Sequence, residues 1–393
     1  MALVIKGSSS GQVTVDVPAA AGTNTVTIPA VTGNLPLSNL DHVTNRPNAK
    51  PLIINGDMQV AQRGTSVTGI TASGYNTIDR MSFTISGLGT WTQTQDTTVP
   101  TAKGFTKSLK MDCTTADASP AAGDFCLMQY KIEAQDLQML KYGTSSAEAF
   151  TLRFHVRSPK TGTHIVHVYQ NDGDRHISKA YTISSADTFQ EVIINIEGDT
   201  GGTINNDNGI GLQVEFFLGA GSNSTSGTLA TSWEGYTQAN AAVGQVNCAD
   251  NTANNFFITG LQMEVGEYDT TTIPPFQHES FGDNLSRCQR YYQKSYDYGT
   301  APASATFNGM KFYNTISSGT NNIGGSCDLK VSMRAAPTVT FYDQAGNTNK
   351  FYKGVNNKNG VADMIGTDRF RVISQDSTTA SEGGYHFEAI GEL

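Results

Sequence analysis

A series of short apolar segments, each ended by a turn rich in Gly, Asn or Asp, constrains the fold of this chain more than any other feature. The segments alternate apolar with polar residues or form brief apolar runs, and both patterns are typical of β-strands with a buried face. About nine or ten strands at this spacing predict a two-sheet sandwich. An apolar strand opens the module at Leu52 and runs into Asn55-Gly56-Asp57. The other strands that we expect are 80–86, 108–113, 125–132, 150–156, 164–169, 179–183, 189–196, 211–217 and 256–265.

Three regions follow from these patterns. Residues 1–50 hold an N-terminal β-repeat and a linker, 51–282 hold the sandwich, and 283–393 hold a linking helix and a small C-terminal β-module with strands at 370–373 and 385–389. A length of 393 residues suits two or three domains. We therefore expect an all-β protein.

Two helices are expected beside the strands. Residues 133–141 predict one inside the sandwich, with Leu137 and Leu140 facing the core. Residues 283–292 predict the linking helix, with Asp283 or Asn284 as its N-cap. One stripe of this helix would carry Leu285, Cys288 and Tyr292.

The N-terminal region contains a short repeat. Residues 14–19 match residues 25–30, and each unit is a short alternating strand ended by proline. So short a segment cannot bury its own apolar face, and such repeats need neighbours to complete a core. The neighbours could be other copies of the chain; the alternative is a flexible tail with a chance similarity. Residues 34–51, with three prolines, are interpreted as a linker.

Charge and hydropathy argue against several classes of partner. The net charge is −9 without a Lys/Arg cluster, so we expect no nucleic-acid partner. No apolar run reaches the roughly 20 residues that cross a bilayer, so no membrane insertion is expected. The first residues lack a signal-peptide pattern, while the low charge is typical of surface β-proteins. This combination favours a virion part released by lysis; a secreted β-sandwich is the plainer alternative.

The five cysteines are widely scattered and form no CxxC pair, so we interpret them as free, mostly buried thiols. Cys113 and Cys126 could instead lie across a hairpin and form a disulfide.

Signals of catalysis are lacking in the sequence. His164 and His167 differ by three positions and point to opposite faces of a strand, which argues against a shared transition-metal site. No G-x-S-x-G elbow, Walker loop or H-E-x-x-H motif is found, nor the repeat pattern of a glycan-cleaving β-helix. We predict that the protein is not an enzyme and has no catalytic residues.

Several segments resemble bacteriophage virion appendage proteins, chiefly tail fibres and spikes. They are N-G-D at 55–57, I-T-G-L-Q-M-E-V-G at 258–266, Q-R-Y-Y at 289–292 and M-R-A-A-P-T-V at 333–339. The resemblance implies that 51–282 form a jelly-roll sandwich of the carbohydrate-binding type. It also implies a homotrimer on the exterior of a phage tail or capsid, attached to other virion proteins through the N-terminal segment, with a host-surface polysaccharide as partner.

The resemblance further implies a structural Ca²⁺ between the first and last strands of the jelly roll, held by Asp57 and Glu264. Ca²⁺ takes about 6–8 oxygen ligands, several of which can be backbone carbonyls, so two carboxylates would suffice. The alternative is that Asp57 is a turn residue and Glu264 a surface residue.

Glycan binding needs aromatic rings for the apolar face of a sugar, together with amides and carboxylates for its hydroxyls. Trp91, Trp233 and Tyr236 lie in Gly/Ser/Thr-rich stretches and are the candidate ligand contacts. Either tryptophan could equally be a core or interface residue.

Two functions remain open. The first is a homotrimeric tail fibre or spike that binds host-surface glycans during adsorption. The second is a capsid-decorating fibre or tail adaptor without a receptor role. A secreted carbohydrate-binding module attached to an enzyme is a third class, but the remaining length has no room for a catalytic domain.

Overall fold

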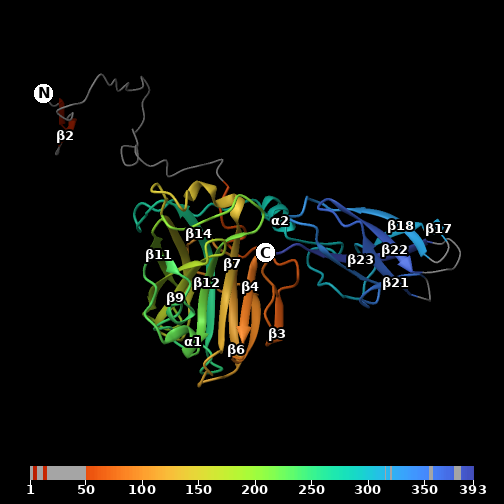
Figure 1. The fold of residues 1–393 in the computed structure, drawn as a ribbon, viewed down its shortest axis with the longest axis horizontal. Coiled ribbons are helices and arrows are strands. Elements are labelled where there is room, and N and C mark those ends of the chain that lie inside the picture. Colours follow the sequence, from red (N-terminus) through yellow and green to blue (C-terminus); the bar gives the residue numbers. More distant parts are fainter. Residues whose placement is uncertain are drawn as a thin grey trace. The chain divides into compact units, whose positions relative to one another are not determined.

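The computed structural model describes residues 3–6, 12–15, 50–314, 316–318, 321–353, 357–375 and 382–393 (Figure 1). The chain forms two units by its internal contacts, Met1–Thr44 and Asn45–Leu393. In the first unit, β1 (Leu3–Lys6) pairs antiparallel with β2 (Gln12–Val15). The second copy of the predicted repeat and most of the predicted linker lie outside the described residues.

Two six-stranded antiparallel sheets form the sandwich in the second unit (Figure 1). Sheet I has the order β13-β10-β9-β12-β7-β4, and sheet II the order β11-β8-β14-β6-β5-β3. The strands of sheet I are β4 (Met81–Ser86), β7 (Phe125–Glu133), β9 (Gly162–Gln170), β10 (Arg175–Ile183), β12 (Ile210–Ala220) and β13 (Glu234–Gly235). The strands of sheet II are β3 (Ser66–Ile70), β5 (Thr90–Asp96), β6 (Ser108–Thr115), β8 (Phe150–Arg157), β11 (Gln190–Ile196) and β14 (Asn255–Val265).

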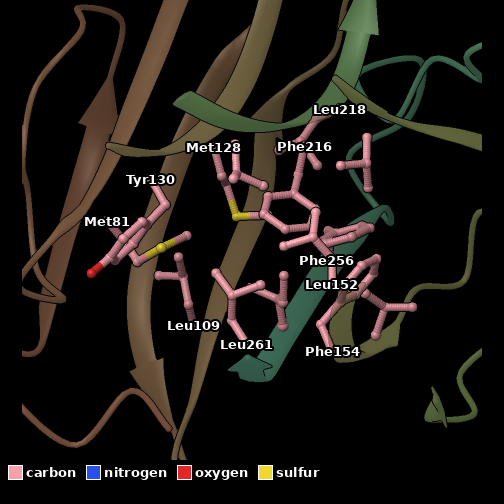
Figure 2. Packing of buried hydrophobic residues seen from close by; sticks show 14 of the residues in the cluster. Met81, Leu109, Met128, Tyr130, Leu152, Phe154, Phe216, Leu218, Phe256 and Leu261 are labelled. Carbon is pink, nitrogen blue, oxygen red and sulfur yellow. The ribbon is translucent and has the colours of Figure 1, made fainter. Parts of the chain in front are cut away.

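Alternation along the strands fills the space between the sheets. On β12, Val214 and Phe216 are fully buried, and Phe216 meets Phe154 of β8 edge to face at 5.1 Å (Figure 2). Met128 of β7 lies in the same cluster. Each such side chain contributes about 1.5–3 kcal/mol when it leaves water, so this core holds the two sheets together.

The all-β fold class and the nine strands expected after the opening one are confirmed. The opening strand is wrong, because residues 52–57 form turns. Asn55 adopts φ +60°, which ends extended structure, and its side-chain amide donates to the carbonyls of Val60 and Asp79. Strands β3, β5 and β13 were not predicted, because their polar residues conceal the alternation.

The helical segments are short. The segment predicted at 133–141 is a 3-10 helix, η2 (Ala134–Leu140), which buries Leu137 and Leu140 as expected. Two further short helices, α1 (Ser222–Thr225) and η3 (Gln238–Asn240), precede and follow β13.

The linking helix is α2 (Phe281–Gln289). Its N-cap is Ser280, whose hydroxyl accepts from the backbone N–H of Asp283 at 3.2 Å, so the predicted cap at Asp283 or Asn284 is wrong. Tyr292 belongs to the next strand instead of the helix.

The C-terminal module consists of two small antiparallel sheets around buried aromatic rings, among them Phe341, Phe351 and Phe370. The strands predicted at 370–373 and 385–389 are confirmed. One sheet contains β15 (Tyr292–Lys294), β16 (Lys311–Asn314), β19 (Thr338–Tyr342) and β23 (Glu382–Ile390). The other contains β17 (Ile316–Ser318), β18 (Asn321–Asp328), β20 (Lys350–Phe351), β21 (Lys358–Asp363) and β22 (Arg369–Gln375).

A buried ionic cluster joins this module to the sandwich. The guanidinium of Arg80 donates to Glu392 at 2.6 Å and lies 3.4 Å from the ring centre of Tyr291. Arg63 pairs with the same carboxylate at 3.0 Å, and Arg290 pairs with Glu133 of β7 at 2.7 Å. These contacts tie residues far apart in the sequence into one compact unit.

All five cysteines are free and buried, as predicted, so Cys113 and Cys126 form no disulfide. Among the described residues, no helix has the length and apolar character needed to cross a membrane.

Candidate ligand-binding site

The outer face of sheet I carries a row of polar side chains. The strand register places Gln129 of β7 opposite Glu215 of β12, and Glu215 opposite His167 of β9. All three point away from the core because their neighbours along each strand point into it. His167 and Gln129 thus meet Glu215 on one surface, although they lie 48 and 86 positions from it in the sequence.

Hydrogen bonds link this row into a chain. The amide of Gln129 donates to one oxygen of Glu215 at 2.5 Å, and Nδ1 of His167 lies 2.7 Å from the other. Nε2 of His167 lies 3.0 Å from Nδ1 of His176 on β10. His176 is fully buried, and its Nε2 accepts from the backbone N–H of Thr237 at 3.2 Å. This chain of hydrogen bonds therefore connects the sheet face to the segment that follows β13.

Two tyrosines cover these hydrogen-bonded side chains. Tyr236 has 43% of its surface exposed, and its ring meets those of Tyr169 and His176 edge to face, each at 5.1 Å. Its backbone N–H donates to the carbonyl of Asp174 at 2.9 Å. The phenol of Tyr169 donates to the Asp174 carboxylate at 2.8 Å. An aromatic surface thus stands directly beside ordered carboxylates and imidazoles.

A pocket of about 170 Å³ opens between the sheet face and the segment that contains α1 and η3. Both apolar and polar groups line it, which is the composition that a small ligand needs for affinity and orientation. The lining residues are Thr84, Phe125, Leu127, His167, Glu215, Phe217, Ser224, Tyr236, Gln238 and Ala241.

The electrostatics of the site follow from burial. Burial lowers the pKa of His176, and the nearby His167 lowers it further, while Glu234 and Asp174 oppose this shift. Burial also raises the pKa of Tyr236. At neutral pH the ring of His176 is therefore uncharged, and the hydroxyl of Tyr236 keeps its proton. The arrangement can hold a polyhydroxylated ligand by hydrogen bonds and ring contacts.

Of the three predicted aromatic contacts, only Tyr236 lies at this site. Trp91 is fully buried, its indole N–H donates to the Leu88 carbonyl at 2.9 Å, and its ring packs on Phe83. The prediction for Trp91 is wrong, because β5 places this side chain between the sheets. Trp233 is half-buried, and its indole N–H donates to the Glu197 carbonyl at 2.7 Å.

The two predicted calcium ligands have separate partners. Asp57 is buried, with its carboxylate 3.6 Å from Nδ1 of His278 and 3.4 Å from the amide of Asn284. Glu264 accepts from the amide of Gln262 at 3.0 Å. Across the part of the chain that the structure describes, no three His, Cys, Asp or Glu side chains converge as metal ligands. A calcium site here would need backbone oxygens for most of its ligands, and it stays a prediction.

Sequence reasoning missed His176, Glu215 and Tyr169 as members of the site. It did place His164 and His167 on opposite faces, which is confirmed: His164 stacks on the buried Tyr181, and His167 lies on the outer face. The alternation of β9 and β12 does indicate which of their side chains point outward. Their meeting, however, depends on the order of the strands.

No protein-family model matches this sequence, and no curated protein matches it significantly. Similar solved structures include the enzymatically active domain of tailspike protein 4 of bacteriophage CBA120, at 13% identity over 55% of this chain and 21% of that chain, with a TM-score of 0.29. A proposed sugar-binding protein from Bacteroides thetaiotaomicron shows 14% identity over 55% and 100% of the two chains, with a TM-score of 0.28.

The family 11 carbohydrate-binding module of a cellulosomal cellulase of Clostridium thermocellum shows 11% identity over 56% of this chain and 96% of that chain, with a TM-score of 0.25. The chain spans only about a fifth of the tailspike domain's length. Likenesses this distant carry no argument about function, which rests on the geometry of the site.

Proposed function

We propose that the protein is a homotrimeric tail fibre or spike of a bacteriophage virion, and that the outer face of sheet I binds host-surface glycans during adsorption. The N-terminal segment would attach the trimer to other virion proteins. The phage assignment rests on the resemblance of the segments around 258–266, 289–292 and 333–339 to virion appendage proteins.

One observation carries the glycan-binding proposal. The exposed ring of Tyr236 lies beside Tyr169 and lines a pocket together with Glu215 and His167, and Gln129 is hydrogen-bonded to Glu215. A sugar ring has an apolar face that suits an aromatic ring and hydroxyls that suit amides and carboxylates. The site supplies both within one surface.

Binding of the purified full-length chain to an array of neutral and acidic oligosaccharides tests this proposal. We expect Tyr236→Ala to weaken binding at least about tenfold, because exposed aromatic anchors commonly contribute more than 1.4 kcal/mol. Tyr268→Ala is the matched control, since Tyr268 lies beside Thr151 of β8 on sheet II. Equal binding by wild type and Tyr236→Ala, or no binding to any glycan, would contradict the proposal.

The virion role is tested separately. Purified protein should block infection, and a virion reconstruction should find the chain at the distal end of the tail. Copies on capsid symmetry axes would instead favour a decorating fibre without a receptor role. A monomeric mass in light scattering at micromolar concentration would refute the trimer.

A further inference from the structure

The hydrogen-bond chain behind Tyr236 has only one arrangement of protons when both imidazoles are neutral. A carboxylate only accepts, so Nδ1 of His167 donates to Glu215 and Nε2 of His167 is left as an acceptor. Nδ1 of His176 must then donate to that nitrogen, because two lone pairs would otherwise face each other at 3.0 Å. Nε2 of His176 is left as the acceptor for the backbone N–H of Thr237.

An added proton cannot be accommodated in this chain of hydrogen bonds without breaking one of them. If it binds His176, it must occupy Nε2, where it faces the N–H of Thr237. If it binds His167, it must occupy Nε2, and the His176 proton then has to move from Nδ1 to Nε2. Both routes end with a proton on Nε2 of His176, which can donate to Glu234 Oε1 at 3.3 Å but can no longer accept from Thr237.

We propose that His176 is a positioning residue of the glycan-binding face, and that one proton taken up by the His167–His176 pair releases Thr237 and displaces Tyr236. The effect on ligand binding rests on the function proposed above. Tyr236 is held by two backbone bonds, its own to Asp174 and that of Thr237 to His176. Only the second has a titratable acceptor, so acid would remove one anchor and leave the other.

The surroundings keep the ring of His176 neutral at neutral pH. The ring of His176 is fully buried, and burial lowers its pKa below the ordinary 6.5. The release therefore belongs to the acid side of the usual histidine range. The charged and titratable side chains facing the pair are Glu215 from β12, Glu234 from β13, Tyr169 from β9, Asp174 from the β9–β10 turn, Tyr236, and Lys131 from β7 beside Glu215.

Hydrogen exchange by mass spectrometry on the full-length chain tests the proton-dependent release of Thr237 without any ligand. We expect the Thr237 amide, corrected for its intrinsic rate, to exchange about tenfold faster near pH 5.5 than near pH 7.5, the factor that one hydrogen bond of ordinary net strength supplies. In His176→Gln the amide can accept from Thr237 but takes no proton, so protection should be the same at both pH values. Unchanged protection in the wild type would overturn the proposal.

A second variant keeps the proposal testable if His176→Gln fails to fold. Glu234→Gln removes the carboxylate that would receive the added proton's hydrogen bond, and Glu234 is only half-buried. The pH at which protection is lost should move downward in this variant, and an unmoved or higher midpoint would contradict the mechanism.

Binding of the tightest oligosaccharide on the array should weaken over the same pH range in wild type and not in His176→Gln. Protection lost in acid without glycan binding at any pH would refute the proposed function and leave the positioning role standing. Glycan binding with pH-independent protection would refute the positioning role and leave the proposed function standing.

Discussion

Replacing Glu392 by glutamine should destabilise the compact unit strongly. The carboxylate is only 6% exposed and receives Arg80 at 2.6 Å and Arg63 at 3.0 Å. Glutamine keeps the shape and removes the charge, so two buried guanidinium groups lose their shared anion. Arg63 retains Asp79 at 3.7 Å, and Arg80 retains the Tyr291 ring, so the loss is partly compensated.

Breaking a buried ion pair by removing one partner costs about 3–5 kcal/mol, and because of the remaining contacts we expect a loss of about 3 kcal/mol here. With a urea dependence of about 3 kcal/mol/M, the unfolding midpoint should fall by about 1 M. Far-UV circular dichroism and tryptophan fluorescence should be followed together, because Trp91 and Trp233 report only on the sandwich.

The matched control is Glu267→Gln, the same chemical change at an exposed position, which should stay within about 0.5 kcal/mol of wild type. In the double variant Arg80→Met/Glu392→Gln, the loss should be smaller than the sum of the single losses, because the pair is already broken. A Glu392→Gln midpoint equal to that of the Glu267→Gln control, or strict additivity in the double variant, would show that the cluster does not hold the module.

Two buried titratable groups each make stability rise with pH, but over different pH ranges. Burial lowers the pKa of Lys294 to about 8, and its ammonium donates to three backbone carbonyls. Stability should therefore rise between about pH 8 and 10.5. Lys294→Met should flatten that rise in thermal melts. Burial lowers the pKa of His155 to about 4, and neither ring nitrogen has a hydrogen-bond partner among the described residues. Stability that is present above about pH 6.5 should be lost as the pH falls toward 4, and His155→Leu should reduce this loss in urea titrations; an unchanged pH profile in either variant would refute its assignment.

Much of the fold could be predicted because strand patterns are local. Alternation identified β7, β8, β9 and β12 to within a few residues, and the isolated cysteines were correctly expected to be free and buried. The opening segment failed because its apolar residues are buried in turns, where the left-handed Asn55 outweighs β-propensity. Burial alone therefore does not distinguish a strand from a packed turn.

The candidate site was harder to predict, since aromatic residues in polar stretches have two possible fates. Trp91 and Tyr236 both lie among Gly, Ser and Thr, yet one is fully buried and the other 43% exposed. Trp91 sits on a strand whose inward positions were hidden by threonines and glutamines. Tyr236 follows the short edge strand β13, which leaves its ring on the surface.

The sequence by itself determined the all-β class, the spans of most strands and the opposite orientation of His164 and His167, because these depend on the two-residue period of a strand. Only the tertiary structure decided that Glu215, His167 and His176 form one chain of hydrogen bonds ending at Thr237. That chain depends on strand order and register between distant segments, which pairing across the whole sheet selects and no local pattern encodes.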